Sequence, residues 1–517
     1  MPHDYPDFES FRSLAEESES NILIPIFRRL MSDQITPVLA YRRLVRPDDR
    51  LAPSFLLESV EGGSRQGRYS YLGAQPTIQI IARGNEVHYV DDRGLAGRSM
   101  TYQSDDPLAE MHKITSKWKL AQVDGLPDFS GGWVGYAAYD TIRYLEGEKL
   151  NEAPTDDREL PDLNMCLYRD IVAFDHVQKT VLVVTHVLMD EHDSVEAAYE
   201  QGVASLDALV NRVETPPDVR PELAVGEVDL QSPPPALPTS NMGEGGYQNA
   251  VEKCKEYIAA GDIFQVVPSQ RFELQTKSDP FDIYRALRVV NPSPYMFYLQ
   301  FGGGMLVGSS PEILCRVKDN VVVSRPLAGT RRRGRDGAED LALEEELLAD
   351  PKEQSEHIML VDLGRNDVGR VAEPGTIELP EIMVIERYSH VMHISSTVTG
   401  RLRDGCNCWD ALRVSLPVGT VSGAPKVRAM QIIDELEPHR RGPYAGAVGV
   451  ADFAGNMDMA IALRTMVVMP NGDGWTVHIQ AGAGIVADSV PDLEHQETVN
   501  KAAAMAKAVQ LAENAFG

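Results

Sequence analysis

The chain has 517 residues, of which 43% are hydrophobic and 24% are charged, a balance typical of a globular protein with two or more domains. Its formal net charge of −28 argues against nucleic acid or an anionic membrane as a partner. There is no run of about 18 apolar residues and no signal-peptide pattern. Because the five cysteines are widely spaced and indicate reduced thiols, we expect a cytoplasmic protein.

The first part of the chain is rich in strand-like runs. In chain order, strands are expected at 36–45, 54–60, 77–90, 167–176 and 180–188. The pair Gly84-Asn85 predicts a turn inside the third run. Helices are expected near 106–119 and 193–213. Prolines crowd the segment 214–240, which predicts a linker between domains.

The rest of the chain alternates helices with strands. Helices are expected at 247–261, 338–349, 352–367, 425–436 and 490–514. Strands are expected at 263–274, 295–301, 305–310, 320–326, 460–469 and 474–482. Such grouping favours an α+β fold in which antiparallel sheets pack as a sandwich with helices on the outside. We therefore divide the chain into an N-terminal domain at 1–213, the linker at 214–240 and a C-terminal domain at 241–517.

Two pairs of glutamates give a chemical signal. Glu353 and Glu356 lie three residues apart in one predicted helix, and Glu494 and Glu497 are spaced in the same way in another. Residues three apart share a helical face, so each helix presents two acids side by side. Facing each other, the two pairs would form an oxygen-ligand site suited to Mg²⁺. By spacing alone, two solvated helix faces are the alternative.

Eleven short motifs occur together in the second half of the chain. They are, in order, GDIFQVVPSQR, NPSPYMFYL, GSSPE, PLAGTRRRG, SEHIMLVDLGRND, SHVMHISS, GTVSGAPK, RRGPYAGAVG, ALRT, QAGAG and HQETVNKA. With this set, the chain resembles the chorismate-utilising enzymes, and among them the anthranilate synthase component I family. The resemblance covers 241–510, and the run FLLES extends it into the N-terminal half.

The resemblance implies a metal site that serves chorismate, a dianion with a ring carboxylate and an enolpyruvyl carboxylate. Glu356 and Glu497 would hold a Mg²⁺ that binds the ring carboxylate, with Glu353 and Glu494 behind them through water. Lys501, one helical turn after Glu497, can pair with these acids. The metal would supply positive charge that this acidic chain otherwise lacks.

Further motif positions imply contacts with the rest of the substrate. Arg464 and Tyr444 match the family's clamp on the enolpyruvyl carboxylate, for which a planar guanidinium offers bidentate recognition. Glycine-containing segments match backbone that approaches the substrate closely. Their residues are Gly329, Thr330, Gly482, Ala483 and Gly484.

Three side chains match catalytic positions of the family. Glu312 matches the acid that protonates the departing hydroxyl when ammonia adds to the ring. His393 matches the base that removes a ring proton before pyruvate leaves, and an unperturbed pKa near ~6.5 suits that task. A structural histidine is the alternative there. Thr420 is placed to hydrogen-bond the ring substituents.

Two positions indicate the nucleophile. Relatives that add water carry an activating lysine where this chain has Gln265, and aminodeoxychorismate synthases typically carry a nucleophilic lysine where it has Ala328. Ammonia remains, so the resemblance implies synthesis of anthranilate and pyruvate, the first committed step of tryptophan biosynthesis. Aminodeoxychorismate synthesis is the alternative, because a few relatives depart from the lysine rule.

The resemblance also implies a partner and an inhibitor. None of the five cysteines lies in a glutaminase-like elbow, so we expect a separate glutamine amidotransferase subunit and a hetero-oligomer. Feedback inhibition by tryptophan is implied by two runs, which make the N-terminal domain regulatory and the C-terminal domain catalytic. Glu58 and Ser59 would receive the amino-acid group, and Pro294, Tyr295 and Met296 would wall the indole. A strand edge and a proline turn are the alternative.

Overall fold

The structure is a computed structural model of the whole chain, and it describes a defined set of residue ranges. The described ranges are 4–17, 21–45, 51–59, 67–92, 97–150, 152–216, 225–387 and 391–516. Part of the predicted linker, 217–224, lies outside them, as do Ser389 and His390 of the SHVMHISS motif.

One large sheet combines strands from both halves of the chain. In spatial order its eleven strands are β13 (Ser269–Thr276), β25 (Gly474–Gly482), β24 (Thr465–Asn471), β15 (Met305–Ser310), β14 (Tyr295–Gln300), β2 (Ser54–Glu58), β3 (Tyr69–Ala74), β10 (Ile171–Asp175), β11 (Thr180–Leu188), β1 (Ile22–Met31) and β7 (Lys119–Leu120). Neighbouring strands are antiparallel except β1 and β7. The halves meet where β14 pairs with β2, with Met296 opposite Glu58.

A second large sheet is built in the same way. In spatial order its strands are β18 (Leu327–Arg332), β20 (Val391–Arg401), β17 (Val321–Ser324), β16 (Ile313–Lys318), β23 (Met457–Ile461), β22 (Ala447–Asp452), β8 (Gly132–Ala137), β9 (Leu163–Tyr168), β4 (Ile78–Arg83), β5 (Glu86–Asp91) and β6 (Arg98–Gln103), with β19 (Glu378–Arg387) paired to β20. Here the halves meet at the antiparallel pair β22 and β8. A short pair joins β12 (Gln265–Val266) to β21 (Gly423–Ala424).

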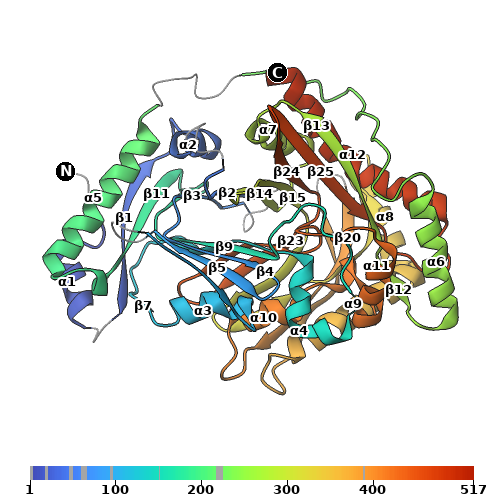
Figure 1. Ribbon diagram of the computed structural model, residues 1–517, viewed down its shortest axis with the longest axis horizontal. Helices are drawn as coiled ribbons and strands as arrows, with labels where there is room; N and C mark the ends of the chain where they lie inside the picture. The colour runs from blue at the N-terminus through green and yellow to red at the C-terminus, as the bar shows by residue number, and fades with distance from the viewer. Residues whose placement is uncertain are drawn as a thin grey trace.

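The helices lie on the outside of the two sheets (Figure 1). They are α1 (Phe8–Glu16), α2 (Pro37–Leu44), α3 (Glu110–Thr115), α4 (Arg143–Glu146), α5 (Val195–Glu214), α6 (Gly246–Ala260), α7 (Pro280–Val290), α8 (Gly337–Ala349), α9 (Pro351–Gly369), α10 (Cys408–Ser415), α11 (Lys426–Leu436) and α12 (Pro491–Phe516). One buried apolar cluster contains side chains of both sheets, such as Phe297 and Val448, so the sheets pack face to face. The predicted α+β sandwich is therefore confirmed.

One predicted strand is wrong. The run 36–45 forms helix α2, because Thr36 caps its first turn and Pro37 occupies the first helical position. Tyr41 and Leu44, one turn apart, are buried on the same face. Apolar residues at this spacing belong to a helix, so the β-branched and aromatic content of the run was misleading.

Three other predicted strands are interrupted, and each interruption moves the chain to another sheet. The run 167–176 divides into β9 and β10, the run 263–274 into β12 and β13, and the run 460–469 into β23 and β24. A continuous apolar run does not reveal such a crossing, because the segments before and after it are both buried, each in its own sheet. The helix expected at 106–119 is shorter and covers only Glu110–Thr115 after a 3₁₀ turn.

The boundary between the two halves is not a break in the fold. Both large sheets cross from one half to the other. The proposed domain boundaries at 213 and 241 therefore stay a prediction. The hydrogen bonds between strands continue from one half of the chain to the other in both sheets. Of the linker, Ser232 accepts a hydrogen bond from Lys507 of α12.

Candidate active site

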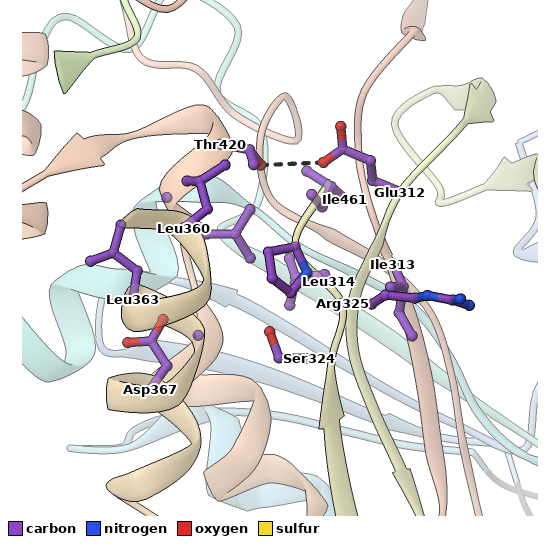
Figure 2. Close-up of a pocket in the computed structure, with 14 residues that line it drawn as sticks. Glu312, Ile313, Leu314, Ser324, Arg325, Leu360, Leu363, Asp367, Thr420 and Ile461 are labelled. Atoms are coloured by element: carbon purple, nitrogen blue, oxygen red, sulfur yellow. Dashed lines mark hydrogen bonds between the residues drawn. The ribbon is translucent and has the colours of Figure 1, made fainter. Parts of the chain in front are cut away.

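The candidate acid Glu312 precedes β16 and contacts the 3₁₀ turn η6 (Gly419–Val421). Thr420 Oγ1 donates a hydrogen bond of 3.2 Å to Glu312 Oε2. Figure 2 shows this pair at one end of a cavity that Leu360 and Asp367 of α9 also line. Burial raises the pKa of Glu312, and the bond from Thr420 opposes that rise. A carboxyl group with a raised pKa retains its proton at higher pH, as an acid catalyst requires.

The candidate base His393 lies on β20, directly opposite Thr330 of β18. Its Nδ1 lies 3.0 Å from Gly329 O and 3.0 Å from Thr330 Oγ1. Donation from Nδ1 to the carbonyl places the lone pair of the neutral ring on Nε2. Burial lowers the pKa of His393, the bond to Gly329 opposes this, and the charge of Arg464 lowers the pKa further. The imidazole is therefore kept in its neutral form near pH 7, in which Nε2 can accept a proton.

Arg464 lies where the chain passes from β23 to β24, and so from one sheet to the other. Its backbone is in the left-handed region, with φ of 46°, which ends the strand that the sequence predicted. Its NH1 donates a 3.1 Å hydrogen bond to Asn291 Oδ1, and its carbonyl accepts one from Ser309 N. Its positive charge opposes the rise in the pKa of Glu312 and adds to the lowering of the pKa of His393.

Tyr444 and two of the motif glycines, Gly482 and Gly484, lie in tightly packed surroundings. A Cβ at Gly482 would lie 3.0 Å from Tyr444 Oη and 2.7 Å from Pro268 O, and Tyr444 is only 5% exposed. A Cβ at Gly484 would lie 2.7 Å from Gln265 Nε2. A side chain is excluded at Gly482, where the close atom is backbone, whereas at Gly484 the side chain of Gln265 would have to move.

Gly329 and Ala483 are constrained in different ways. Gly329 has φ of 66°, which favours glycine, and a Cβ there would lie 3.1 Å from Glu353 Oε2. The backbone N–H of Ala483 donates to Tyr247 Oη at 3.2 Å, so this group is used by helix α6.

The four helical glutamates influence one another across α9 and α12. Burial raises the pKa of Glu356, and the charges of Glu353 and Glu497 raise it further. Burial also raises the pKa of Glu494, opposed by a hydrogen bond from Ser489 and reinforced by Glu497. Like-charged groups that penalise each other's ionisation mark a place where a cation is favourable.

Three of these glutamates form ion pairs or hydrogen bonds with basic or amide side chains. Lys501 Nζ lies 2.7 Å from Glu497 Oε1, which confirms the predicted pairing. Arg331 NH1 donates to Glu353 Oε1 at 3.2 Å. Gln265 Nε2 donates to Glu356 Oε1 at 3.2 Å. Within the described ranges, no three or more His, Cys, Asp or Glu side chains are already arranged as a set of metal ligands.

The candidate inhibitor pocket lies where β2 and β14 pair. Glu58 is 7% exposed and accepts a 2.7 Å hydrogen bond from Tyr284 Oη. Arg288 Nε lies 2.8 Å from Glu58 Oε2. Ser59 Oγ is buried and has no hydrogen-bond partner among the described residues.

The other wall of this pocket is the NPSPYM run. Tyr295 Oη accepts from Arg316 NH2 at 3.1 Å and donates to Asp458 Oδ1 at 3.3 Å. Pro294 is buried, and Met296 is 1% exposed beside Glu58. The pairing of β2 with β14 thus places Met296 opposite Glu58, whereas the Tyr295 hydroxyl is held by Arg316 and Asp458.

Some residues of this site were not found from the sequence. Asn291 lies in the NPSPYM run and Arg331 in PLAGTRRRG, but nothing in either motif singled them out. Gln265 was considered only as the replacement of a lysine, and its contact with Glu356 depends on the short pair β12–β21. Only long-range contacts reveal these roles, because the partners are 22 to 173 positions apart in the chain.

Comparison with known proteins agrees with this geometry. The family model for chorismate binding enzymes matches residues 53–507. The anthranilate synthase alpha subunit 1, chloroplastic, of Oryza sativa subsp. indica is 54% identical, over 98% of this chain and 91% of that protein. Anthranilate synthase component 1 of Pseudomonas putida is 48% identical, over 95% and 96%. The crystal structure of anthranilate synthase component I from Streptococcus pneumoniae superposes with a TM-score of 0.73 at 35% identity, covering 92% of this chain and 99% of that one.

These matches span the candidate acid, base, clamp and glutamate pairs. The chain therefore belongs to the chorismate binding enzymes, in the branch formed by anthranilate synthase component I. Within the described part of the chain, no helix has the length and apolar character needed to span a membrane.

Proposed function

We propose that this protein converts chorismate and ammonia into anthranilate, pyruvate and water. The observation that carries the proposal is the hydrogen bond of 3.2 Å from Thr420 to Glu312, whose pKa burial raises, together with the charge of Arg464, which acts on both Glu312 and His393. The named activity of the relatives supports the same reaction. Because Ala328 offers no amine, the aminodeoxychorismate alternative has less support.

In the proposed mechanism, Arg464 and Tyr444 bind the enolpyruvyl carboxylate and orient the ring. Ammonia forms the new C–N bond while Glu312 gives its proton to the departing hydroxyl, which leaves as water. His393 Nε2 then takes the ring proton as the bond to the enolpyruvyl oxygen breaks, which leaves an aromatic ring. The departing enolpyruvate takes up a proton at its methylene carbon and becomes pyruvate. Each role uses the protonation state that the surroundings of the residue favour.

A direct assay tests this proposal. The purified chain, given chorismate, Mg²⁺ and an ammonium salt at raised pH, should produce anthranilate, which is detected by its fluorescence. Accumulation of a non-aromatic amino product would instead support the aminodeoxychorismate alternative. Absence of any product would contradict both.

A Mg²⁺ ion is part of the proposal. Glu356 and Glu497 would hold it and Glu353 and Glu494 would lie behind them, because Mg²⁺ takes one or two carboxylates and keeps open positions for water and substrate oxygens. The raised pKa values of Glu356 and Glu494, caused first by burial and then by neighbouring glutamates that include Glu497 for both, support a cation between the helices. When bound, the metal would supply positive charge for the ring carboxylate.

We further propose a separate glutamine amidotransferase subunit, in a hetero-oligomer with this chain. The terms "component 1" and "alpha subunit" in the names of the relatives support a second subunit. Burial raises the pKa of Cys166, Cys254 and Cys315 to about 12, which is unsuited to a nucleophilic thiolate. The chain alone should therefore use ammonium salts but not glutamine. We keep the cytoplasm as the proposed location, although the plant relatives are chloroplastic.

Tryptophan feedback completes the proposal. Glu58 and Ser59 would bind the amino-acid group, and Pro294, Tyr295 and Met296 would contact the indole. Support comes from Asn291, which begins the same run as the indole wall and also holds Arg464. A displacement of this run would move the substrate clamp, so tryptophan and chorismate would weaken each other's binding.

A further inference from the structure

A buried ion pair lies beside the candidate site and has no role in the proposed chemistry. Arg441 is 2% exposed and Glu437 is 4% exposed. Arg441 NH2 lies 2.6 Å from Glu437 Oε1, and Nε lies 3.0 Å from Oε2. Burying two charges costs free energy that their attraction barely offsets, so the pair calls for a reason other than stability.

The guanidinium of Arg441 also holds backbone on two sides of the site. Its NH1 donates to Val421 O at 2.8 Å, next to Thr420, and its NH2 donates to Val267 O at 2.6 Å, two residues after Gln265. Arginine presents five donors in a fixed plane, so one side chain fixes both carbonyls and the carboxylate together. The backbone segments that carry Thr420 and Gln265 thus share one support.

Two aromatic rings contact the same guanidinium. Its central carbon lies 4.6 Å from the ring centroid of Tyr139 and 5.6 Å from that of Tyr444. Tyr444 is the candidate substrate ligand, whereas Tyr139 belongs to the N-terminal half, in the 3₁₀ turn η3 (Tyr139–Ile142). The buried hydroxyl of Tyr139 has no hydrogen-bond partner among the described residues, so its ring rather than its hydroxyl makes the polar contact.

Residues of the N-terminal half also donate hydrogen bonds to the turn that carries Arg441. Tyr139 N donates to Gly442 O at 3.0 Å, and Arg158 NH2 donates to Arg441 O at 3.0 Å. Gly442 has φ of 59°, and a Cβ there would lie 3.2 Å from Arg158 NH2. The turn from Arg441 to Tyr444 is therefore shaped by contacts from the other half of the chain.

We propose that Arg441 is a positioning residue that sets Tyr444 for the substrate, and that the Tyr139 ring of the N-terminal half holds Arg441 in place. The N-terminal half thus contributes to chorismate binding in the uninhibited enzyme as well as to regulation. This inference rests on the role of Tyr444 in the proposed function.

The test compares two substitutions of Tyr139, which leave the buried ion pair intact. Tyr139→Phe keeps the ring and removes only the unpartnered hydroxyl, whereas Tyr139→Leu removes the ring. We expect Tyr139→Leu to weaken chorismate binding and raise its KM about tenfold, the scale of one desolvated cation–π contact. The kcat and the KM for ammonium should stay within about twofold of the parent values. Tyr139→Phe should match the parent in all of these.

Binding is measured by calorimetry with chorismate and Mg²⁺ in the absence of ammonium, and melting temperatures check the fold. If Tyr139→Leu does not fold, Tyr139→Met, which keeps more of the volume without a ring, takes its place. Equal KM values for the Phe and Leu variants, or a loss confined to kcat, would overturn the inference. If the parent binds chorismate but makes no anthranilate, the proposed reaction fails while the binding comparison still decides this inference. A parent that does not bind chorismate overturns both.

Discussion

The two candidate ligand sites each contain a glutamate, and the partners of the two side chains differ. In the inhibitor pocket, Glu58 has the permanent cation of Arg288 within 2.8 Å and the hydroxyl of Tyr284 at 2.7 Å. In the substrate site, Glu312 accepts a side-chain hydrogen bond of 3.2 Å from the neutral hydroxyl of Thr420. Burial beside a hydroxyl raises the pKa of Glu312 and so favours its protonated form.

This difference suits Glu58 to binding a charged group of a ligand and Glu312 to donating a proton. In the proposed inhibitor pocket, Glu58 on the paired strands β2 and β14 would contact the ammonium group of tryptophan. The substrate site offers a proton, a neutral imidazole and acids that repel one another. Disruption of the substrate site should therefore affect turnover, and disruption of the pocket should affect only inhibition.

The largest expected effect concerns the acid and the base. Glu312→Gln should lower anthranilate formation about 10³-fold by leaving the hydroxide without a proton. His393→Ala should lower it by a similar factor at a later step, so the aminated compound that still carries the enolpyruvyl group should accumulate. Mass spectrometry of the reaction mixture distinguishes the two variants. If neither mixture contains that intermediate, His393 acts only as a structural residue.

The glutamate pairs should give the next largest effect. Glu356→Gln or Glu497→Gln should lower turnover about 10²-fold, because the ring carboxylate loses its counter-charge. Circular dichroism should show an intact fold. Asp362→Asn is the matched control, since Asp362 is exposed on the same helix as Glu356 and pairs only with Arg365 among the described residues. Near-normal turnover of the glutamate variants would remove the metal assignment.

A change confined to the inhibitor pocket should leave turnover nearly unaltered. Ser59→Phe fills the space beside the unpartnered Ser59 hydroxyl and should raise the tryptophan concentration needed for half inhibition by about tenfold or more. Uninhibited anthranilate formation is the internal control. If tryptophan inhibits this variant as strongly as the parent, its pocket lies elsewhere.

The smallest expected effect is a metal-dependent change in stability. Because the folded-state pKa of Glu356 and Glu494 is raised, the folded protein binds more protons than the unfolded chain as pH rises above their ordinary value. These acids therefore reduce stability as pH rises through that window, and a bound cation should offset the loss. Saturating Mg²⁺ should raise the melting temperature by about 2 °C at pH 7.5 and by less at pH 5. An equal shift at both pH values would contradict a carboxylate site.

Much of the fold was predictable because local signals agreed with the final structure. Helix α9 begins where Asp350 caps it and Pro351 opens it, and α6 ends at Gly261 in the left-handed region. The hairpin of β4 and β5 turns at Gly84-Asn85 as expected. Prediction failed at 36–45, where a cap and a helical apolar face outweighed strand-forming residues.

The sequence by itself determined many of the helices and strands, the helical placement of the glutamate pairs and, through its motifs, the family. It could not determine how the halves combine, because strand pairing such as β2 with β14 joins residues more than 200 positions apart. Only the tertiary structure brought Asn291 to Arg464, Gln265 to Glu356 and Tyr139 to Arg441. Local propensity acts over a few residues, whereas the burial and partner that give each of these side chains its role come from distant segments packed against it.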